Sequence, residues 1–440
     1  MQGINQGTGA AARSVALAYN SSGYVASFTD ALGRAMNFQY DLAGRVTQQT
    51  LPDGRHIAYG YDANGNVTSI TPPGRGAHTF SYTAVDQQDH YTPPALSGGV
   101  TVTHYSYNLD KQLTQITRPD NQRIDFSYDT GGRLSAVVLP QGQIAVSYHP
   151  TRGQVTRLTA PSGDTLDYTY DGFLPVNETW SGAVAGSVSR VNNNTFQVTG
   201  LSVNGSVINY AYDNDGLLTL TGAETLTRDA QNGLLTATAL GNLSTAQSYN
   251  GFAELVGHSA AYSGSALYNV AYTRDKLGRI TQKIETLAGV TTTYDYLYDT
   301  PGRLSQVKQN GATVASYSYD SNGNRLGGFD RRGAITATVD AQDRLTGYKG
   351  AAYGYTANGE LLTKTVSGAT TTYSYDVIGN LRHVALPGGT TIDYLIDGRH
   401  RRVGKKLNGT LVQGFLYQDQ LNPVAELNGS GAVVARFAYG

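Results

Sequence analysis

This sequence of 440 residues contains no cysteine and carries almost no net charge. The missing thiols exclude disulfide bonds, thiolate metal sites and cysteine nucleophiles, although they do not decide the cellular compartment. The 32 basic residues are balanced by 33 acidic ones, and the net charge of −1 leaves no global field that would attract nucleic acid or an anionic membrane. We therefore expect neither kind of partner.

Long apolar runs are also missing. No stretch of about 18 apolar residues is present to span a bilayer, and residues 1–18 lack the basic start and the apolar segment of a secretory signal. What the chain has instead is 53 glycines, 32 tyrosines and abundant threonine, serine and asparagine, with only 15% charged residues. This composition is typical of strands and tight turns, so we predict an all-β protein.

One pattern recurs about every 21 residues along the chain, which is the signature of a repeat protein. It consists of two aromatic residues two positions apart, an acidic residue, two variable positions, glycine, a polar residue and an aliphatic residue. Tyr40, Tyr61 and Tyr82 occupy equivalent positions in three successive copies. The residues that we predict to have the structural role in the repeats are Tyr40, Asp41, Gly44, Arg45, Tyr61, Asp62, Gly65, Tyr128, Asp129, Gly132, Arg133, Tyr298, Asp299, Gly302, Arg303, Tyr319, Asp320, Gly323, Tyr375, Asp376 and Gly379.

Each repeat is expected to be a strand, a turn, a returning strand and a second turn. The aromatic residues alternate with others and so share one strand face, the aspartate caps the turn, and the glycine supplies a positive φ. The second turn lies half a period away, at proline-containing segments such as 52–54 and at the pairs 310–311 and 408–409, where Asn-Gly favours a two-residue hairpin. Hairpins laid edge to edge twist and curl, so we expect a spiral sheet or a closed shell.

Residues 1–440 are predicted to form one continuous repeat architecture, with a poorly patterned lead-in over residues 1–18. Segments 75–99 and 172–204, the latter with the single tryptophan Trp180, break the pattern and are expected to be longer loops or odd strands. No shift in composition marks a domain boundary. Because the last residues begin a fresh copy of the aromatic phrase, we expect the chain to be truncated at its C-terminus.

The repeated phrase Tyr-x-Tyr-Asp-x-x-Gly-Arg/Asn-Leu/Val resembles the YD repeat of RHS proteins, a family that includes bacterial polymorphic toxins, insecticidal toxin-complex subunits and animal teneurins. The resemblance begins near Tyr19, and residues 394–440, with Asp397, Gly398 and Arg399, are especially similar to bacterial members. It implies a spiral β-sheet that forms a hollow shell around a C-terminal toxic polypeptide. With about 20 repeats, we expect an open or incomplete shell.

Bacterial members end this shell with an RHS core that cleaves itself beside an Asp-Pro-x-Gly motif. This sequence has no Asp-Pro pair, so the resemblance assigns no cleavage residue to it. The core and the toxin are expected to follow the C-terminus of these 440 residues.

Candidate catalytic motifs have structural alternatives. Asp129, Thr130 and Gly131 spell the triplet of aspartic proteases, but Asp129 stands at the ordinary turn position and a second triplet is missing, so we favour a turn. A glycosidase would need two carboxylates at a suitable separation, which a sequence does not show. The eight histidines lack metal-ligand spacing, and no nucleophile elbow is present. We predict no enzyme, and no catalytic, cofactor-binding or metal-binding residues.

The segment 398–406 holds the strongest local positive charge. It resembles a phosphate-binding loop only faintly, because Lys406 stands where serine or threonine would hold the metal. Such a segment could hold an acidic cargo, a phosphate or a partner chain, or it could be a solvated strand face. We favour the solvated face, since arginine recurs at this position of the repeats.

Two functions follow as hypotheses. The first is a structural shell segment of a bacterial RHS toxin-delivery protein, secreted or at the cell surface as part of a larger protein, whose partners are the C-terminal toxin polypeptide and the delivery machinery. The alternative is a cell-surface or secreted binding module that presents a rigid β-repeat face to proteins or glycans, because exposed tyrosine rings suit the apolar face of a sugar.

Overall fold

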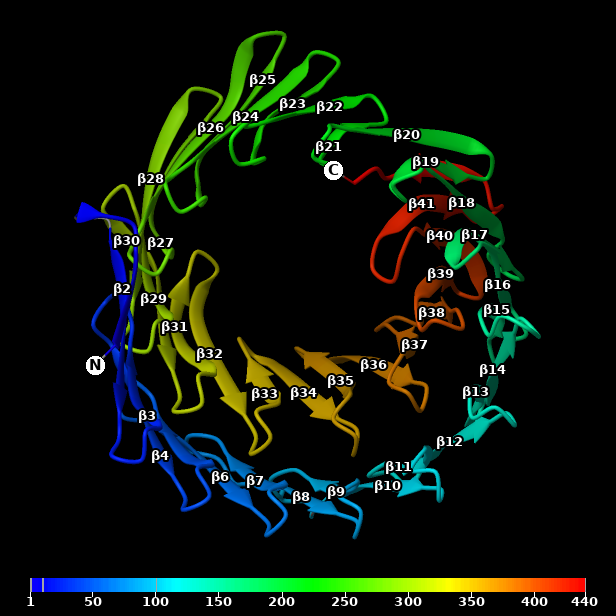
Figure 1. Ribbon diagram of the computed structural model, residues 1–440, viewed down its shortest axis with the longest axis horizontal. Coiled ribbons are helices and arrows are strands. Elements are labelled where there is room, and N and C mark those ends of the chain that lie inside the picture. Colours follow the sequence, from blue (N-terminus) through cyan, green and yellow to red (C-terminus); the bar gives the residue numbers. More distant parts are fainter. Residues whose placement is uncertain (1, 10–11, 100, 440) are drawn as a thin grey trace. The chain divides into compact units, whose positions relative to one another are not determined.

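The computed structural model describes residues 2–9, 12–99 and 101–439, and these residues form 42 β-strands and no helix (Figure 1). The prediction of an all-β protein is therefore confirmed. The chain divides into two compact units, each made of two separate segments: Met1–Thr101 with Thr227–Gly350, and Val102–Leu226 with Ala351–Gly440. We call them the first unit and the second unit and describe each by itself.

The strands of the first unit come from both of its segments. They are β1 (Gln2–Gln6), β2 (Arg13–Tyr19), β3 (Val25–Thr29), β4 (Ala35–Tyr40), β5 (Val46–Thr50), β6 (His56–Tyr61), β7 (Val67–Thr71), β8 (His78–Tyr82), β9 (Gln88–Thr92), β23 (Leu235–Leu240), β24 (Leu243–Tyr249), β25 (Leu255–Tyr262), β26 (Ser265–Arg274), β27 (Ile280–Leu287), β28 (Val290–Tyr298), β29 (Leu304–Gln309), β30 (Ala312–Tyr319), β31 (Arg325–Asp330), β32 (Gly333–Val339) and β33 (Leu345–Tyr348).

The second unit is built in the same way. Its strands are β10 (Thr103–Tyr107), β11 (Leu113–Thr117), β12 (Arg123–Tyr128), β13 (Leu134–Leu139), β14 (Gly142–Tyr148), β15 (Val155–Thr159), β16 (Thr165–Asp171), β17 (Leu174–Ser181), β18 (Gly186–Asn192), β19 (Val198–Val203), β20 (Ser206–Tyr212), β21 (Leu218–Thr221), β22 (Glu224–Arg228), β34 (Ala351–Tyr355), β35 (Leu361–Val366), β36 (Ala369–Tyr375), β37 (Leu381–Ala385), β38 (Thr391–Ile396), β39 (Arg402–Leu407), β40 (Thr410–Tyr417), β41 (Pro423–Asn428) and β42 (Val433–Arg436).

Within each segment, successive strands pair antiparallel with their neighbours in sequence. The pairing of β4 with β5 and of β28 with β29 is representative. In both pairs the strand partners shift register just before the final tyrosine, so that Tyr40 lies opposite Val46 and Tyr298 opposite Leu304. This recurrent β-bulge re-aims the tyrosine at the end of the strand, a feature that the sequence pattern did not indicate.

The two-residue turns have the geometry that the sequence predicted. Asn310 and Gly311 have φ values of 49° and 82°, and Asn408 and Gly409 have 47° and 81°, as a type I′ hairpin turn requires. Ser263 adopts the same conformation before Gly264, although Ser-Gly is a weaker signal than Asn-Gly. At this turn, glycine at the second position is therefore sufficient for the type I′ conformation, without asparagine at the first.

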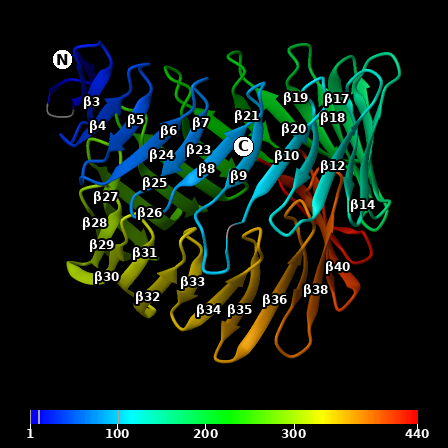
Figure 2. The same ribbon diagram turned by 90° about the horizontal axis from the view of Figure 1, so that it is seen from below.

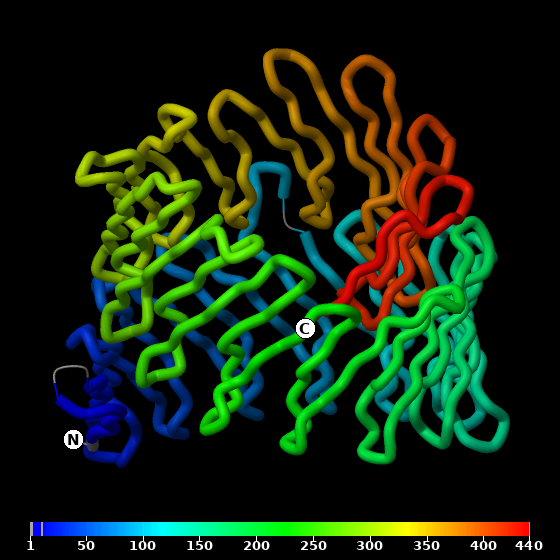
Figure 3. The backbone as a smooth tube through the Cα atoms, turned by 90° about the horizontal axis from the view of Figure 1, so that it is seen from above, coloured from blue at the N-terminus to red at the C-terminus, as the bar shows by residue number. Residues whose placement is uncertain are grey.

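In each unit, hairpins from its two segments lie side by side. Figure 2 shows β3–β9 above β27–β33 in the first unit, and Figure 3 shows the orange and red hairpins of the second unit beside its cyan and green ones. Turns of one row contact turns of the other: the Arg34 guanidinium donates to the Thr300 carbonyl at 3.1 Å, and Asn358 donates to Asp120 at 2.6 Å. Residues about 240 to 270 positions apart thus meet.

The largest group of buried residues is in the second unit, between β16–β20 and β39–β41. Trp180 is 3% exposed there, and Val188, Leu416 and Val424 are fully buried. The expectation of longer loops over 172–204 is wrong, because β17, β18 and β19 pair antiparallel in this segment, with a register shift between Val191 and Asn192. Segment 75–99 contains β8 and β9 and ends in a loop closed by a bridge between Leu96 and Gly99.

Candidate functional site

The tyrosine that ends a repeat strand is fixed by a hydrogen bond to the preceding strand. Its hydroxyl donates to the backbone carbonyl of a residue 14 to 18 positions earlier. Among the pairs are Tyr40 to Val25 at 2.8 Å, Tyr61 to Val46 at 2.8 Å, Tyr128 to Leu113 at 2.8 Å, Tyr298 to Ile280 at 2.7 Å and Tyr319 to Leu304 at 2.6 Å. These tyrosines therefore join neighbouring hairpins through their side chains as well as their backbones.

The aspartate after this tyrosine organises the turn. Oδ1 of Asp41 accepts hydrogen bonds from the backbone N–H groups of Ala43 at 2.9 Å and Arg45 at 3.0 Å, and its Oδ2 accepts from Arg45 Nε at 2.7 Å. The bond from the Arg45 backbone lowers the pKa of the Asp41 carboxyl. In five other turns, Oδ1 of the aspartate likewise accepts a hydrogen bond from the backbone N–H four positions later. The acceptor and donor pairs are Asp62 and Asn66, Asp129 and Arg133, Asp299 and Arg303, Asp320 and Asn324, and Asp376 and Asn380.

The glycine of each turn occupies the left-handed backbone region. Gly44, Gly65, Gly132, Gly302, Gly323 and Gly379 have φ values from 76° to 100°. A side chain at Gly44 would also collide with the Tyr24 hydroxyl, which lies near the position of a Cβ atom.

The arginine after the glycine reaches the next repeat. The Arg45 guanidinium lies 4.7 Å from the centroid of the Tyr61 ring, and its Nη1 donates to the Asp62 carbonyl at 2.9 Å. Arg303 makes the equivalent contacts: its guanidinium lies 4.5 Å from the centroid of the Tyr319 ring, and its Nη1 donates to the Asp320 carbonyl at 3.2 Å. We call this linked series the Tyr-Asp-Arg row. The sequence pattern showed its members but not that the arginine bridges two repeats.

Asp129 belongs to this row. Its carboxylate binds Arg133 at 2.6 Å and the Gly131 backbone N–H at 2.9 Å. These bonds explain the Asp-Thr-Gly triplet as a turn, and the partner of the carboxylate is a guanidinium rather than a second carboxylate.

A buried ionic cluster lies in the second unit, formed by Glu178, Arg190, Asp397 and Arg401. Arg190 lies 3.1 Å from Glu178, while Arg401 lies 3.5 Å from Glu178 and 2.8 Å from Asp397. The indole N–H of Trp180 donates to Asp397 at 3.2 Å. Arg401 is 3% exposed, so the expected solvated face is wrong at this residue.

The buried ionic cluster lacks the arrangement of a two-carboxylate hydrolase. A pocket of about 260 Å³ lies beside it and is lined by Arg190 and Asp419, but Glu178 and Asp397 do not line this pocket. Burial raises the pKa of the neighbouring Tyr168 phenol to about 12. The cluster instead ties β17 and β18 to the turn that precedes β39.

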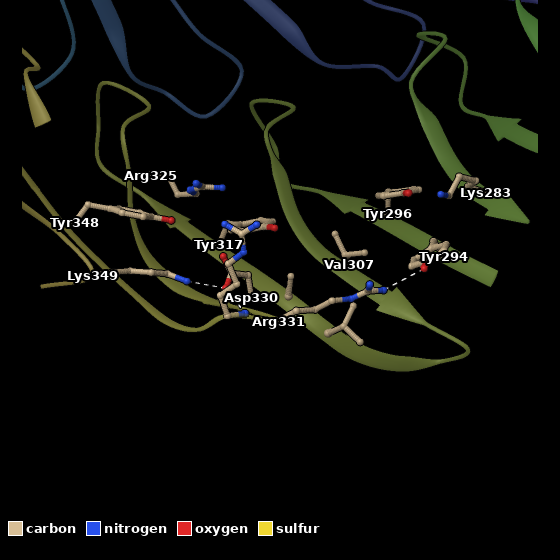
Figure 4. Close-up of a pocket in the computed structure, with 13 residues that line it drawn as sticks. Lys283, Tyr294, Tyr296, Val307, Tyr317, Arg325, Asp330, Arg331, Tyr348 and Lys349 are labelled. Carbon is tan, nitrogen blue, oxygen red and sulfur yellow. Dashed lines mark hydrogen bonds and ion pairs between the residues drawn. The ribbon is translucent and has the colours of Figure 1, made fainter. Parts of the chain in front are cut away.

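A second pocket, of about 620 Å³, lies in the first unit on strands β27–β33 (Figure 4). We call it the basic tyrosine pocket. Its polar and aromatic lining consists of Lys283, Tyr294, Tyr296, Tyr317, Arg325, Asp330, Arg331, Arg332, Tyr348 and Lys349. Sequence reasoning missed this site, because its cations come from three separate repeats that each have ordinary composition.

The structure does not assemble a metal site from the described histidines and acids, since no group of three or more of them is placed to hold an ion. His383 pairs with Asp393 at 2.6 Å on neighbouring strands. Among the residues described, no helix is long and apolar enough to cross a membrane.

The antiparallel hairpins and the Tyr-Asp-Arg row define a YD-repeat protein. The profile of the family described as Teneurin YD-shell matches residues 4–439, so the chain belongs to this family. Mouse teneurin-3 is 32% identical over 165 residues, which are 36% of this chain and 6% of that protein. Human teneurin-1 is 25% identical over 348 residues, which are 72% of this chain and 12% of that protein.

Solved structures share the fold over almost the whole chain. The crystal structure of TcdB2-TccC3 has a TM-score of 0.66 at 13% identity and covers 97% of this chain and 31% of that one. The crystal structure of TcdB2-TccC3-TEV has a TM-score of 0.65 at 13% identity and covers 98% of this chain and 30% of that one. The predicted YD-shell fold and family are thereby confirmed, and the chain spans less than a third of each of these relatives.

Proposed function

We propose that this chain is a structural shell segment of a bacterial RHS toxin-delivery protein, which sequesters a C-terminal toxic polypeptide of the same parent protein. The observation that supports this role best is the fold shared with TcdB2-TccC3 over 97% of the chain. The structure of TcdB2-TccC3 without its hypervariable C-terminal region has a TM-score of 0.60 to this chain. A shell that folds without that variable region suits a container for exchangeable cargo.

In this proposal the chain has no enzymatic step of its own. The tyrosines, aspartates, glycines and arginines of the repeats have a structural role, the 440 residues form one continuous shell segment, and the partners are the toxin polypeptide and the delivery machinery. The parent protein acts outside the cell or at its surface. The turn carboxylates support this role, because they are engaged by arginine, asparagine and backbone N–H groups of the Tyr-Asp-Arg row.

Protection from protease tests the proposal. The parent protein, expressed whole, should shield its C-terminal polypeptide from proteinase K, whereas the same polypeptide expressed alone should be digested. A parent carrying Arg401→Ala, which weakens the buried ionic cluster, should lose the protection. Equal digestion of the enclosed and the isolated polypeptide would contradict sequestration, and so would a parent gene with no polypeptide to enclose.

The alternative function is a cell-surface or secreted binding module that presents a rigid β-repeat face to proteins or glycans. Exposed aromatic rings such as Tyr262, which is 54% exposed, are available for such contacts. Specific binding of the purified chain on a glycan array, together with an unprotected C-terminal polypeptide, would favour this function over the shell.

A further inference from the structure

We propose that the basic tyrosine pocket is a binding site for an acidic, extended polypeptide segment. The pocket lies on one face of β27–β33, where Figure 4 shows Arg331 extending toward Tyr294 and Lys349 directed at Asp330. Five cationic side chains line it and only one carboxylate does. This excess of positive charge contrasts with the net charge of −1 of the whole chain.

Two of the five cations already have acidic partners. Lys349 lies 2.7 Å from Asp330, and Lys283 lies 3.1 Å from Glu285, just outside the pocket. The Lys349 hydrogen bond lowers the pKa of the Asp330 carboxyl, so this acid remains ionised and its charge is cancelled by the lysine.

The three guanidinium groups of the pocket make no close ion pair, although Arg332 interacts electrostatically with Asp330. Arg325, Arg331 and Arg332 are exposed, and in the part of the chain that the structure describes none of them has a carboxylate within 4.0 Å. Arg331 is held in place by neutral acceptors, the Tyr294 hydroxyl at 3.1 Å and Gln309 Oε1 at 2.7 Å. Its charge is therefore oriented but available to a carboxylate of a ligand.

The spread of these cations favours a chain over a small anion. Lys283 and Arg331 both contact Tyr294 on β28, and Lys349 contacts Asp330 at the end of β31. The charged groups therefore span three strand spacings of about 4.8 Å, or about 14 Å. A single phosphate could reach only one or two of the cations. An extended peptide that rises about 3.3 Å per residue would cover this distance with about four or five residues and could place carboxylates near more than one of the guanidinium groups.

The tyrosines argue against a nucleic acid as the occupant. Lys283 lies 4.5 Å from the centroid of the Tyr294 ring, Arg325 lies 5.0 Å from that of Tyr317, and Lys349 lies 5.9 Å from that of Tyr348. Cations thus cover ring faces on which bases would have to stack. The site does not depend on the proposed shell function, because it concerns any acidic segment that reaches this face.

Fluorescence anisotropy with the purified 440-residue chain tests the proposal. The probe is a fluorescein-labelled nonapeptide of alternating glutamate and threonine, and its counterpart carries glutamine in place of glutamate. We expect the glutamate peptide to bind, with an affinity that falls as salt rises, and Arg331→Gln/Arg332→Gln to weaken it about tenfold. Arg325→Gln removes a guanidinium at the other end of β31 and should weaken binding of the glutamate peptide independently.

The matched control is Arg123→Gln/Arg152→Gln, which removes two exposed arginines of the second unit and the same amount of charge. Thermal unfolding of each variant confirms that it is folded. Equal binding of the two peptides, an equal loss in the control variant, or tighter binding of oligo-dT than of the acidic peptide at the same salt would each overturn the proposal.

Discussion

The arginine of the Tyr-Asp-Arg row has two very different environments along the chain. Arg133 and Arg401 each bind the aspartate four positions earlier, at 2.6 Å and 2.8 Å, and each lies over the next tyrosine ring. The Arg133 side chain is 42% exposed, whereas that of Arg401 is 1% exposed. Identical local contacts should therefore differ in energy, because burial removes the solvent that would otherwise screen the pair.

Replacing Arg401 with alanine should destabilise the protein far more than replacing Arg133. Arg401→Ala leaves Asp397 buried without its guanidinium and Glu178 with fewer cations, so we expect a loss of about 3 kcal/mol or more in the free energy of unfolding. Arg133→Ala, the matched control, should cost about 1 kcal/mol or less. Denaturant unfolding of both variants measures the difference, and similar midpoints would show that the cluster contributes little.

The tyrosine hydroxyl of the row can be tested separately from its ring. Tyr298→Phe removes only the hydrogen bond to the Ile280 carbonyl, so we expect a loss of about 1 kcal/mol. Tyr262→Phe is the control, since that ring is 54% exposed, and its effect should be near zero. Indistinguishable unfolding midpoints for the two variants would mean that backbone pairing alone holds the hairpins together.

At the scale of the element, the hairpin is the part of the structure that sequence reasoning described best. Asn-Gly pairs and the Asp-x-x-Gly turn specify the local backbone, because each requires a particular φ at one or two residues. The bulge before the terminal tyrosine and the strand pairing around Trp180 were not predicted. Both depend on neighbouring strands, and a single-strand pattern carries no information about them.

Ion pairs between the two hairpin rows of a unit make a pH-dependent contribution. In the first unit, Arg13 donates to both carboxylate oxygens of Glu254, at 2.8 Å and 2.7 Å, and these hydrogen bonds lower the pKa of Glu254 to about 2. The unfolded value is near 4.5. Because the folded pKa is the lower one, the stabilisation is fully present above pH 4.5 and is lost as pH falls toward 2.

The variant Glu254→Gln should therefore differ from the wild type most above pH 5. The gap in unfolding free energy should shrink between pH 4.5 and 2, as measured by urea titrations at a series of pH values. Arg13→Gln should reproduce the same pH-dependent gap, and the double variant should add little to either single change, since both remove one interaction. A gap that stays constant with pH would show that this ion pair does not stabilise the contact between rows.

For the whole molecule, the periodicity of the sequence predicted the fold but not which repeats meet. Gly7 would collide with the Phe252 ring if it carried a Cβ atom, and Arg118 binds both Glu360 and the Val377 carbonyl. Such partners are about 240 to 260 residues apart. Which residues become partners depends on how many repeats separate the two rows in the sequence. That number depends on the small twist that each hairpin adds to the sheet, and no local motif encodes this twist.

The number of repeats should accordingly be fixed, unlike in a linear solenoid, where an added repeat brings a further stabilising interface. Duplicating residues 134–154, which include β13, β14 and the turn to β15, adds one complete hairpin. It also changes the chain length between partners of the same unit such as Arg118 and Glu360, which are 242 residues apart in the wild type. We expect a lower denaturant midpoint. A control that inserts three Gly-Ser pairs at the turn 162–163 keeps the strand number and should change the midpoint little. An unchanged or higher midpoint for the duplication would show that the repeats stack independently of the contacts between rows.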